Sequence, residues 1–301
     1  MRRLGPTVLL AAALGVSPAA PADEQGIALV VTDEQGAFVP DLRRDEVRVL
    51  ENGDVRELVD FARDERPLSL ALVLDSSDSA TELYRLHAYE DLPAFVALLP
   101  PRAQCTLWTT GDRPRRIGDL EKGAAELEKR LAQGFGTGGA STLLDALVEA
   151  GQSLAGTSGR RRAILAVSGA SAGHTSWSPR EVSDRVRRAR ARVLAVMFRQ
   201  GSGGPGAPRA GLEAPRDAGS LTMVGSSDHE RMLASLARAT GGRFESVPAA
   251  QGVGAVLRAF AGELAGQYRL RYLSLPTKEG RRVEVRIART GVRWHVAVDA
   301  P

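Results

Sequence analysis

The sequence contains a single cysteine, Cys105, so the chain cannot form an internal disulfide. This cysteine lies in Gln104–Trp108, which alternates like a strand, and a lone cysteine in such a segment is usually a small core residue. A catalytic thiol would need a histidine and an orienting partner, and the local sequence supplies neither. We therefore expect Cys105 to be a packing residue.

Lysine is scarce, since only Lys122, Lys129 and Lys278 occur, and the positive charge comes almost entirely from arginine. The formal net charge of the 301 residues is +4. Arg2 and Arg3 belong to a segment that we expect to be removed, which leaves +2 (4 − 2). A charge this small does not indicate a nucleic-acid partner, and the histidines do not have the spacing of metal ligands.

Long apolar runs are also missing. The apolar stretch Val8–Val16 is too short to cross a hydrocarbon core of roughly 30 Å, and no second such run follows it. Arg2 and Arg3 precede the stretch, and Ala20-Pro21-Ala22 follows it as an A-x-A cleavage site. We predict a signal peptide over residues 1–22, export to the periplasm or medium, and no transmembrane segment in the mature chain.

The composition that remains, 43% apolar and 25% charged, is that of a globular protein able to build its own core. From 67 to 248, short apolar strands alternate with helical stretches, which predicts an α/β domain with a mostly parallel sheet and helices on both faces. Leu68–Leu74 is almost wholly apolar, as a central strand buried on both faces should be. The Gly/Pro-rich segment 200–228 is predicted to be an exposed loop, with a short strand at Leu221–Val224.

Both ends of the chain show the alternation of half-buried strands. In 27–62, Asn52-Gly53 follows an apolar alternation and signals a hairpin. In 249–301, an amphipathic helix at Val253–Leu264 precedes strands with period 2. Each set is too small to hold a core alone, so we expect the two to pair into one small β-sandwich.

The most informative motif is Asp75-Ser76-Ser77-Asp78-Ser79, directly after the predicted central strand. The carboxyl ends of parallel strands are where open α/β sheets bind ligands. Asp75 offers a hard carboxylate oxygen, and Ser77 and Ser79 add hydroxyls, a donor set that suits Mg²⁺. A Ser-rich helix N-cap without metal explains the same residues equally well.

The motif resembles the first segment of the metal-ion-dependent adhesion site of von Willebrand factor A (VWA) domains. The stretch Gly138–Leu147 is similar to the second segment, and the match of Asp145-Ala146-Leu147 places the hydroxyl ligand on Ser141, with Thr142 as the alternative. The third segment of the family ends in Ser-Asp-Gly, but here Gly169 occupies the position of the aspartate. The resemblance implies a degenerate site that binds Mg²⁺ weakly or not at all.

The likeness extends over about Ile27–Val298, to exported bacterial "VWFA-related" proteins of acidobacterial type. It implies a Rossmann-like VWA domain in a non-enzymatic module that binds an unknown protein partner. In the wider family, an acidic side chain of the partner completes the metal shell. The loss at Gly169 leaves two interpretations open: a weak metal-assisted contact, or a vestigial site with binding through other surfaces.

Two further patterns have simpler explanations. Gly169-Ala170-Ser171-Ala172-Gly173 matches G-x-S-x-G and raises the alternative of a serine hydrolase, but Thr175–Pro179 separates it from the next predicted helix, and a nucleophile elbow needs that helix at once. The arginine-rich run Arg185–Arg192 is typical of a solvated helix face, with a polyanion patch as the alternative.

Overall fold

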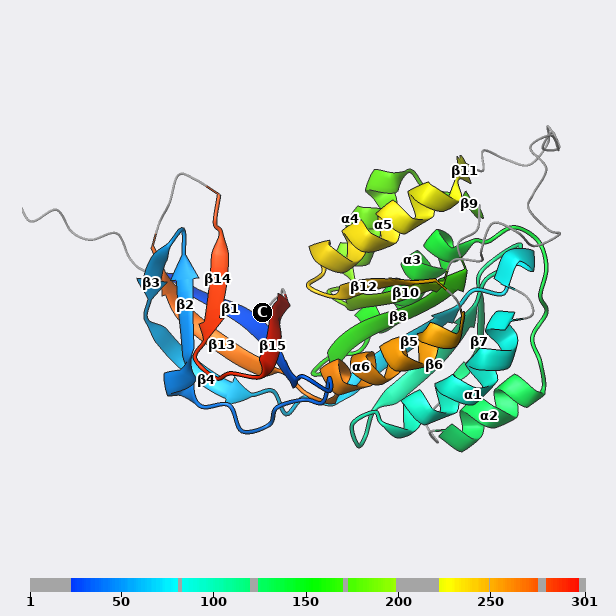
Figure 1. Ribbon diagram of the computed structural model, residues 1–301. Coiled ribbons are helices and arrows are strands. Elements are labelled where there is room, and N and C mark those ends of the chain that lie inside the picture. Colours follow the sequence, from blue (N-terminus) through cyan, green and yellow to red (C-terminus); the bar gives the residue numbers. More distant parts are fainter. Residues whose placement is uncertain are drawn as a thin grey trace, which may run out of the picture.

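The computed structural model describes residues 23–80, 83–119, 124–169, 173–198, 222–248, 250–275 and 280–297. The predicted signal peptide and most of the Gly/Pro-rich loop lie outside these residues. The described elements form an α/β domain and, beside it, a β-sandwich made from both ends of the chain (Figure 1).

The α/β domain is built on a six-stranded sheet in the order β12-β10-β8-β5-β6-β7. Its neighbouring strands are parallel, except for the antiparallel edge pair β6–β7. All seven residues of β5 are buried, as predicted for the central strand. The strands are β5 (Leu68–Leu74), β6 (Gln104–Thr109), β7 (Arg115–Asp119), β8 (Arg161–Gly169), β10 (Arg192–Phe198) and β12 (Arg243–Val247).

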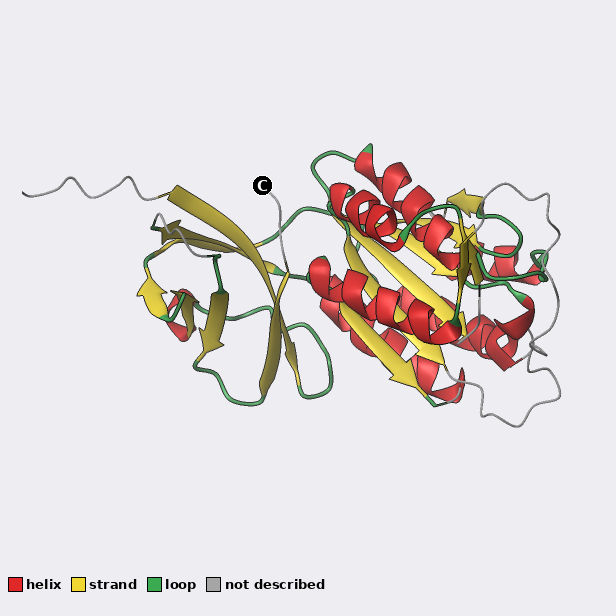
Figure 2. Cartoon of the chain, turned by 90° about the horizontal axis from the view of Figure 1, so that it is seen from above, coloured by secondary structure: helices red, strands yellow, loops and turns green. Residues whose placement is uncertain are grey.

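The side chains of β5 point alternately to the two faces of the sheet and contribute to a separate apolar core on each face. Leu70 and Leu72 join an apolar cluster with α1, α2 and α6, whereas Ala71 and Val73 join one with α3, α4 and α5. Figure 2 shows the helices on the two sides of the sheet. The helices are α1 (Leu83–Ala97), α2 (Ala124–Ala132), α3 (Leu143–Ala155), α4 (Pro179–Arg188), α5 (Ser226–Ala239) and α6 (Val253–Ala265), and the 3-10 turns are Arg44–Glu46, Asp78–Ala80 and Ala250–Gly252.

Two elements adjoin the Gly/Pro-rich segment. The short strand expected there is β11 (Thr222–Val224), which pairs antiparallel with β9 (Gly173–Thr175). Helix α5 begins at Ser226, so it takes in residues expected to belong to the loop. An early start is favourable because Asp228 then lies in the first helical turn, where a negative charge interacts well with the helix dipole.

The β-sandwich consists of two antiparallel sheets, ordered β15-β1-β13-β4 and β14-β2-β3. Strand β1 pairs with both β13 and β15, and β2 pairs with β14, so the expected pairing of the two chain ends is confirmed. The strands are β1 (Asp23–Asp33), β2 (Val47–Glu51), β3 (Asp54–Arg56), β4 (Leu58–Arg63), β13 (Tyr268–Ser274), β14 (Val283–Ile287) and β15 (Val292–Ala297).

Tyr268 lies at the centre of the sandwich core. Its hydroxyl donates a hydrogen bond to the carbonyl of Val39 over 2.8 Å and accepts one from the N–H of Leu42 over 2.9 Å. Its ring stacks on Phe61 with the centroids 5.0 Å apart. One side chain from the C-terminal part of the chain thereby binds the backbone of the segment between β1 and β2 at two points.

Helix α6 and strand β10 connect the two domains. The sequence groups α6 with the C-terminal strands, but its buried face, including Leu257 and Phe260, packs in the core of the α/β domain. On β10, the buried Arg192 forms an ion pair with Glu263 of α6. His295 of β15 contacts the Arg192 guanidinium and lies 3.3 Å from Glu263. The sandwich therefore meets the α/β domain through a polar cluster around a buried charge pair.

Candidate functional site at the carboxyl end of the central strand

Asp75 follows β5 directly, at the carboxyl edge of the sheet, and is fully buried. Strand β5 has β6 on one side and β8 on the other, so Asp75 lies where the connections leave in opposite directions, the usual ligand position of open α/β sheets. Its backbone N–H still donates to the carbonyl of Val167, which continues the β5–β8 ladder. The site that the sequence predicted is therefore at the expected edge of the sheet.

The carboxylate of Asp75 accepts three hydrogen bonds, from three different segments. Oδ1 accepts from the Thr110 hydroxyl over 2.9 Å and from the N–H of Ser77 over 3.1 Å, while Oδ2 accepts from the Ser168 hydroxyl over 2.7 Å. These contacts link its own loop with the ends of β6 and β8. They satisfy a charge that would otherwise be costly to bury.

Backbone contacts bind the remaining loops to the same edge. Gly138 N–H donates to the carbonyl of Ser76, and Asp78 exchanges two hydrogen bonds with Gly139, one through its carboxylate and one through its own N–H. Gly138 and Gly139 have φ of 142° and 75°, a left-handed region that favours glycine. A Cβ at Gly139 would also meet Asp112 Oδ1 at 2.0 Å, so a side chain there would require the exposed Asp112 carboxylate to move.

Ser141 and Thr142, the two candidates for the hydroxyl ligand of the second segment, are both buried. Among the described residues, neither Ser141 Oγ nor Thr142 Oγ1 has a hydrogen-bond partner. Ser77 is also buried, whereas the side chain of Ser79 lies outside the described part of the structure. The structure thus places Asp75, Ser77 and Ser141 in the loops of one edge.

Gly169 ends β8 directly after Ser168, so the position of the missing carboxylate lies at the same edge as Asp75. Across the described ranges, no three or more His, Cys, Asp or Glu residues are grouped as a metal site would require. The motif residues offer a cation the Asp75 carboxylate, which already accepts three hydrogen bonds, and neutral hydroxyls, while the Asp78 carboxylate of the same loop accepts from the N–H of Gly139.

Two residues of this edge were missed by sequence reasoning. Thr110 follows β6 and Ser168 closes β8, and both donate to Asp75. The signal that points to them is positional, because each stands at the carboxyl end of a strand beside β5. Hydroxyl residues at such positions are common, however, so the pattern does not select these two.

Asp145, on which the match to the second segment depends, has hydrogen-bond partners different from those of Asp75. Its carboxylate accepts hydrogen bonds from the Thr175 hydroxyl over 2.6 Å and from both the N–H and hydroxyl of Ser176, over 3.0 and 2.8 Å. It therefore ties the start of α3 to the segment between β9 and α4.

The other candidate residues of the sequence fall in separate places. Ser171 lies outside the described residues, and the G-x-S-x-G segment runs between β8 and β9. Burial raises the pKa of the Cys105 thiol to about 12, so at neutral pH it is a neutral core group.

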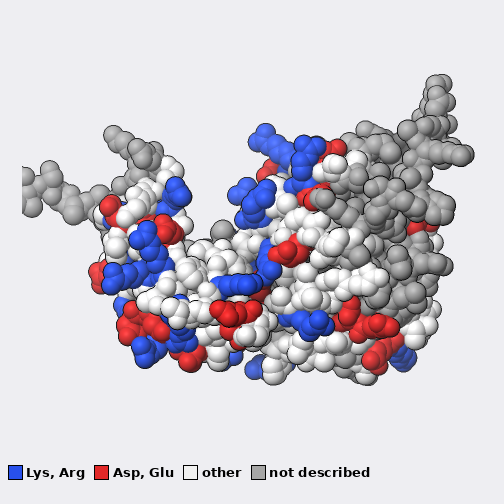
Figure 3. Space-filling model, viewed as in Figure 1, with Lys and Arg blue, Asp and Glu red and all other residues white. Residues whose placement is uncertain are grey.

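Arg187, Arg188 and Arg190, from the arginine-rich run, line a cavity of about 470 Å³ between the ends of α4 and α5. Figure 3 shows Lys and Arg beside the hollow between the domains, with acidic side chains among them.

Solved structures that resemble the chain include proteins with von Willebrand factor A domains. Protein BatB from Bacteroides thetaiotaomicron is 14% identical, with a TM-score of 0.47 over 64% of this chain and 97% of that one. A von Willebrand factor type A protein from Catenulispora acidiphila is 10% identical, with a TM-score of 0.48 over 94% and 76%. Proximal thread matrix protein 1 from the mussel byssus, solved with zinc in its adhesion-site motif, is 12% identical (TM-score 0.48; 69% and 48%).

These likenesses concern the fold alone, because the identities are low. Neither a protein-family model nor a curated protein sequence matches the chain. The α/β domain has the mostly parallel sheet between two helical layers that the resemblance implied, and extra antiparallel strands lie beside it. In the described part of the chain, no helix is both long enough and apolar enough to span a membrane.

Proposed function

We propose that this chain is an exported, non-catalytic protein-binding module whose VWA-type domain carries a degenerate metal site. The observation that supports it is the hydrogen bonding of Asp75, whose carboxylate accepts from Ser77, Thr110 and Ser168. In this proposal, Asp75 is a structural link between three strand ends. A tight divalent-cation site is not expected, because the second anionic ligand is replaced by Gly169 and the remaining donors are neutral.

The partner then binds through surfaces other than a metal ion. A partner carboxylate can complete a metal shell only where a cation is held, and this donor set holds one weakly. Ser141 and Thr142, whose hydroxyls are buried without described partners, are the groups that a weakly bound Mg²⁺ would engage beside Asp75. We therefore place the main contact with the protein partner outside this edge.

A non-catalytic role is supported by the surroundings of the G-x-S-x-G segment. A nucleophile elbow requires a strand that turns directly into a helix. Here β8 is followed by another strand, β9, and α4 begins only at Pro179. The serine hydrolase remains an alternative that an esterase panel tests, with Ser171→Ala as its control.

Capture of partners from envelope extract tests the proposal. The whole chain is immobilised, and bound proteins are compared in Mg²⁺ and in EDTA. We expect a specific partner to be retained equally in both, and to be retained by an Asp75→Asn variant that has passed a folding check. Capture that needs Mg²⁺ and is lost with Asp75→Asn would contradict the proposal and favour a working metal site.

A further inference from the structure

A groove on the α3 side of the α/β domain is lined by both indoles of the domain's core. It has a volume of about 580 Å³, within the range of small-ligand sites. Five of its residues lie on one face of α3, because they are spaced at i, i+3, i+4, i+7 and i+8. The lining residues are Trp108, Asp145, Val148, Glu149, Gln152, Ser153, Ser176 and Trp177.

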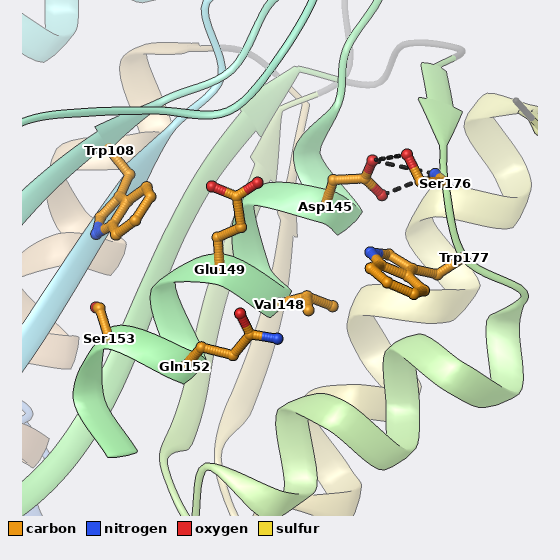
Figure 4. A pocket seen from close by; sticks show the side chains of 8 residues that line it. All are labelled: Trp108, Asp145, Val148, Glu149, Gln152, Ser153, Ser176 and Trp177. Carbon is orange, nitrogen blue, oxygen red and sulfur yellow. Dashed lines mark hydrogen bonds between the residues drawn. The ribbon is translucent and has the colours of Figure 1, made fainter. Parts of the chain in front are cut away.

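The two tryptophans are held in place by the fold. Trp108 is 6% exposed and belongs to the core cluster beneath α3, and its Nε1–H donates to Thr106 over 3.1 Å. Trp177 packs half-buried against the same cluster. In Figure 4 the two indoles lie on opposite sides of the Glu149 carboxylate. The walls of the groove are therefore pre-formed and aromatic.

Glu149 is an acidic lining residue whose carboxylate is not engaged by any neighbour that the structure describes. Among the described residues it has no hydrogen bond and no ion pair, whereas Asp145 has both carboxylate oxygens engaged by Thr175 and Ser176. Desolvation and the nearby Asp145 raise the pKa of Glu149. None of the lining residues is Lys or Arg; the cation that contacts the lining is Arg185, which stacks on Trp177 and, in the described part of the chain, forms no ion pair with Asp145 or Glu149.

The Trp177 indole already stacks with a cationic side chain of the same chain. The guanidinium carbon of Arg185, on α4, lies 3.7 Å from the centroid of the Trp177 ring. Guanidinium groups stack on indoles and pair with carboxylates through a flat set of donors. Lysine presents a compact ammonium instead, which does not match two flat walls as well.

We propose that this groove binds an arginine side chain of the protein partner. The arginine stem packs along the indole of Trp108 and along the face of the Trp177 indole that Arg185 does not cover, and its guanidinium pairs with Glu149. Gln152, one turn further along α3, offers an amide oxygen as a further acceptor. This inference rests on the proposed protein-binding function and names the chemistry of the partner.

The test uses the indole N–H resonances of the whole ¹⁵N-labelled chain, titrated with acetyl-arginine amide. Acetyl-citrulline amide, the neutral isostere, and acetyl-lysine amide are the matched probes. We expect arginine to shift the Trp108 and Trp177 signals, assigned by Trp→Phe variants, and to leave Trp294 unmoved. Citrulline should shift neither. Equal effects of citrulline would overturn the ion pair, and equal effects of lysine would overturn the assignment to arginine.

Glu149→Gln should weaken arginine binding about fivefold, the factor for an ion pair at a partly exposed site. Glu128→Gln changes an exposed acid on α2, which belongs to the helical layer on the other face of the sheet; it is the control and should change nothing. Unchanged binding by Glu149→Gln would overturn the inference. If the partner is still captured equally in Mg²⁺ and EDTA by that variant, only this inference fails and the proposed function stands.

Discussion

The hydroxyl of Ser168 donates a 2.7 Å hydrogen bond to Oδ2 of Asp75, across the ends of two neighbouring parallel strands. The two residues are 93 positions apart in sequence. Thr110, from the strand on the other side of β5, binds Oδ1 of the same carboxylate. The edge whose motif resembles the metal site of VWA domains is thus held together by hydrogen bonds among its own residues.

The first prediction concerns the stability of this link. Asp75→Ala should lower the free energy of unfolding by roughly 1–3 kcal/mol, because it removes charge-assisted hydrogen bonds and leaves buried donors unsatisfied. Thermal and urea melts in EDTA measure it, with the exposed Glu128→Ala as the control. If Asp75 were instead a poised ligand with uncompensated charge, its removal would leave the melting temperature unchanged or raise it.

The second concerns the missing carboxylate. We expect the unmodified chain to bind Mg²⁺ with a Kd of about 1 mM or weaker, and Gly169→Asp to bind more tightly, because ligand charge sets affinity for hard cations. Isothermal titration of both forms decides it. Gly26→Asp adds the same charge in β1 of the sandwich and should have no effect. Tight binding by the unmodified chain would show that another acid, such as Asp78, has replaced the lost ligand.

The third concerns pH. Burial, together with the Arg192 charge, lowers the pKa of His295 from 6.5 to about 4. Between these values the unfolded chain binds a proton that the folded chain does not, so stability falls as pH drops from about 6.5 towards 4. His295→Gln should lose less stability than the unmodified chain between pH 7 and pH 5, in urea melts. His174→Gln, in β9, is the control; equal pH dependence in all three proteins would refute the assignment.

The fourth concerns the contact between α6 and the turn after β1. A Cβ on Gly262 would meet the carbonyl oxygen of Gly36 at 1.8 Å. Gly→Ala inside a helix normally stabilises by up to about 1 kcal/mol, but here we expect a loss of roughly 1–3 kcal/mol from overpacking. Urea melts measure the difference. Gly26→Ala, where a Cβ has open space, is the control and should be near neutral. A more stable Gly262→Ala would show that the two backbones separate easily.

Much of the architecture follows from the pattern of the residues alone. The apolar run Leu68–Leu74 can be buried only if both faces of its strand are covered, which requires a parallel sheet between helical layers. The alternation at the two chain ends requires a shared core, and the pairing of β1 with β13 and β15 supplies it. The position of Asp75 at the end of that run also predicted that this residue lies at the carboxyl edge of the sheet, where the structure has it.

The bonding within that edge was decided by the tertiary structure. Local period and composition say nothing about which hydroxyl meets Asp75, because Thr110 and Ser168 reach it only through the register of β6 and β8 against β5. The contact of His295 with Arg192, and the convergence of Trp108 and Trp177 beside Glu149, likewise join residues far apart in the chain. Such contacts depend on how layers pack, and packing is a property of the whole fold that no single segment encodes.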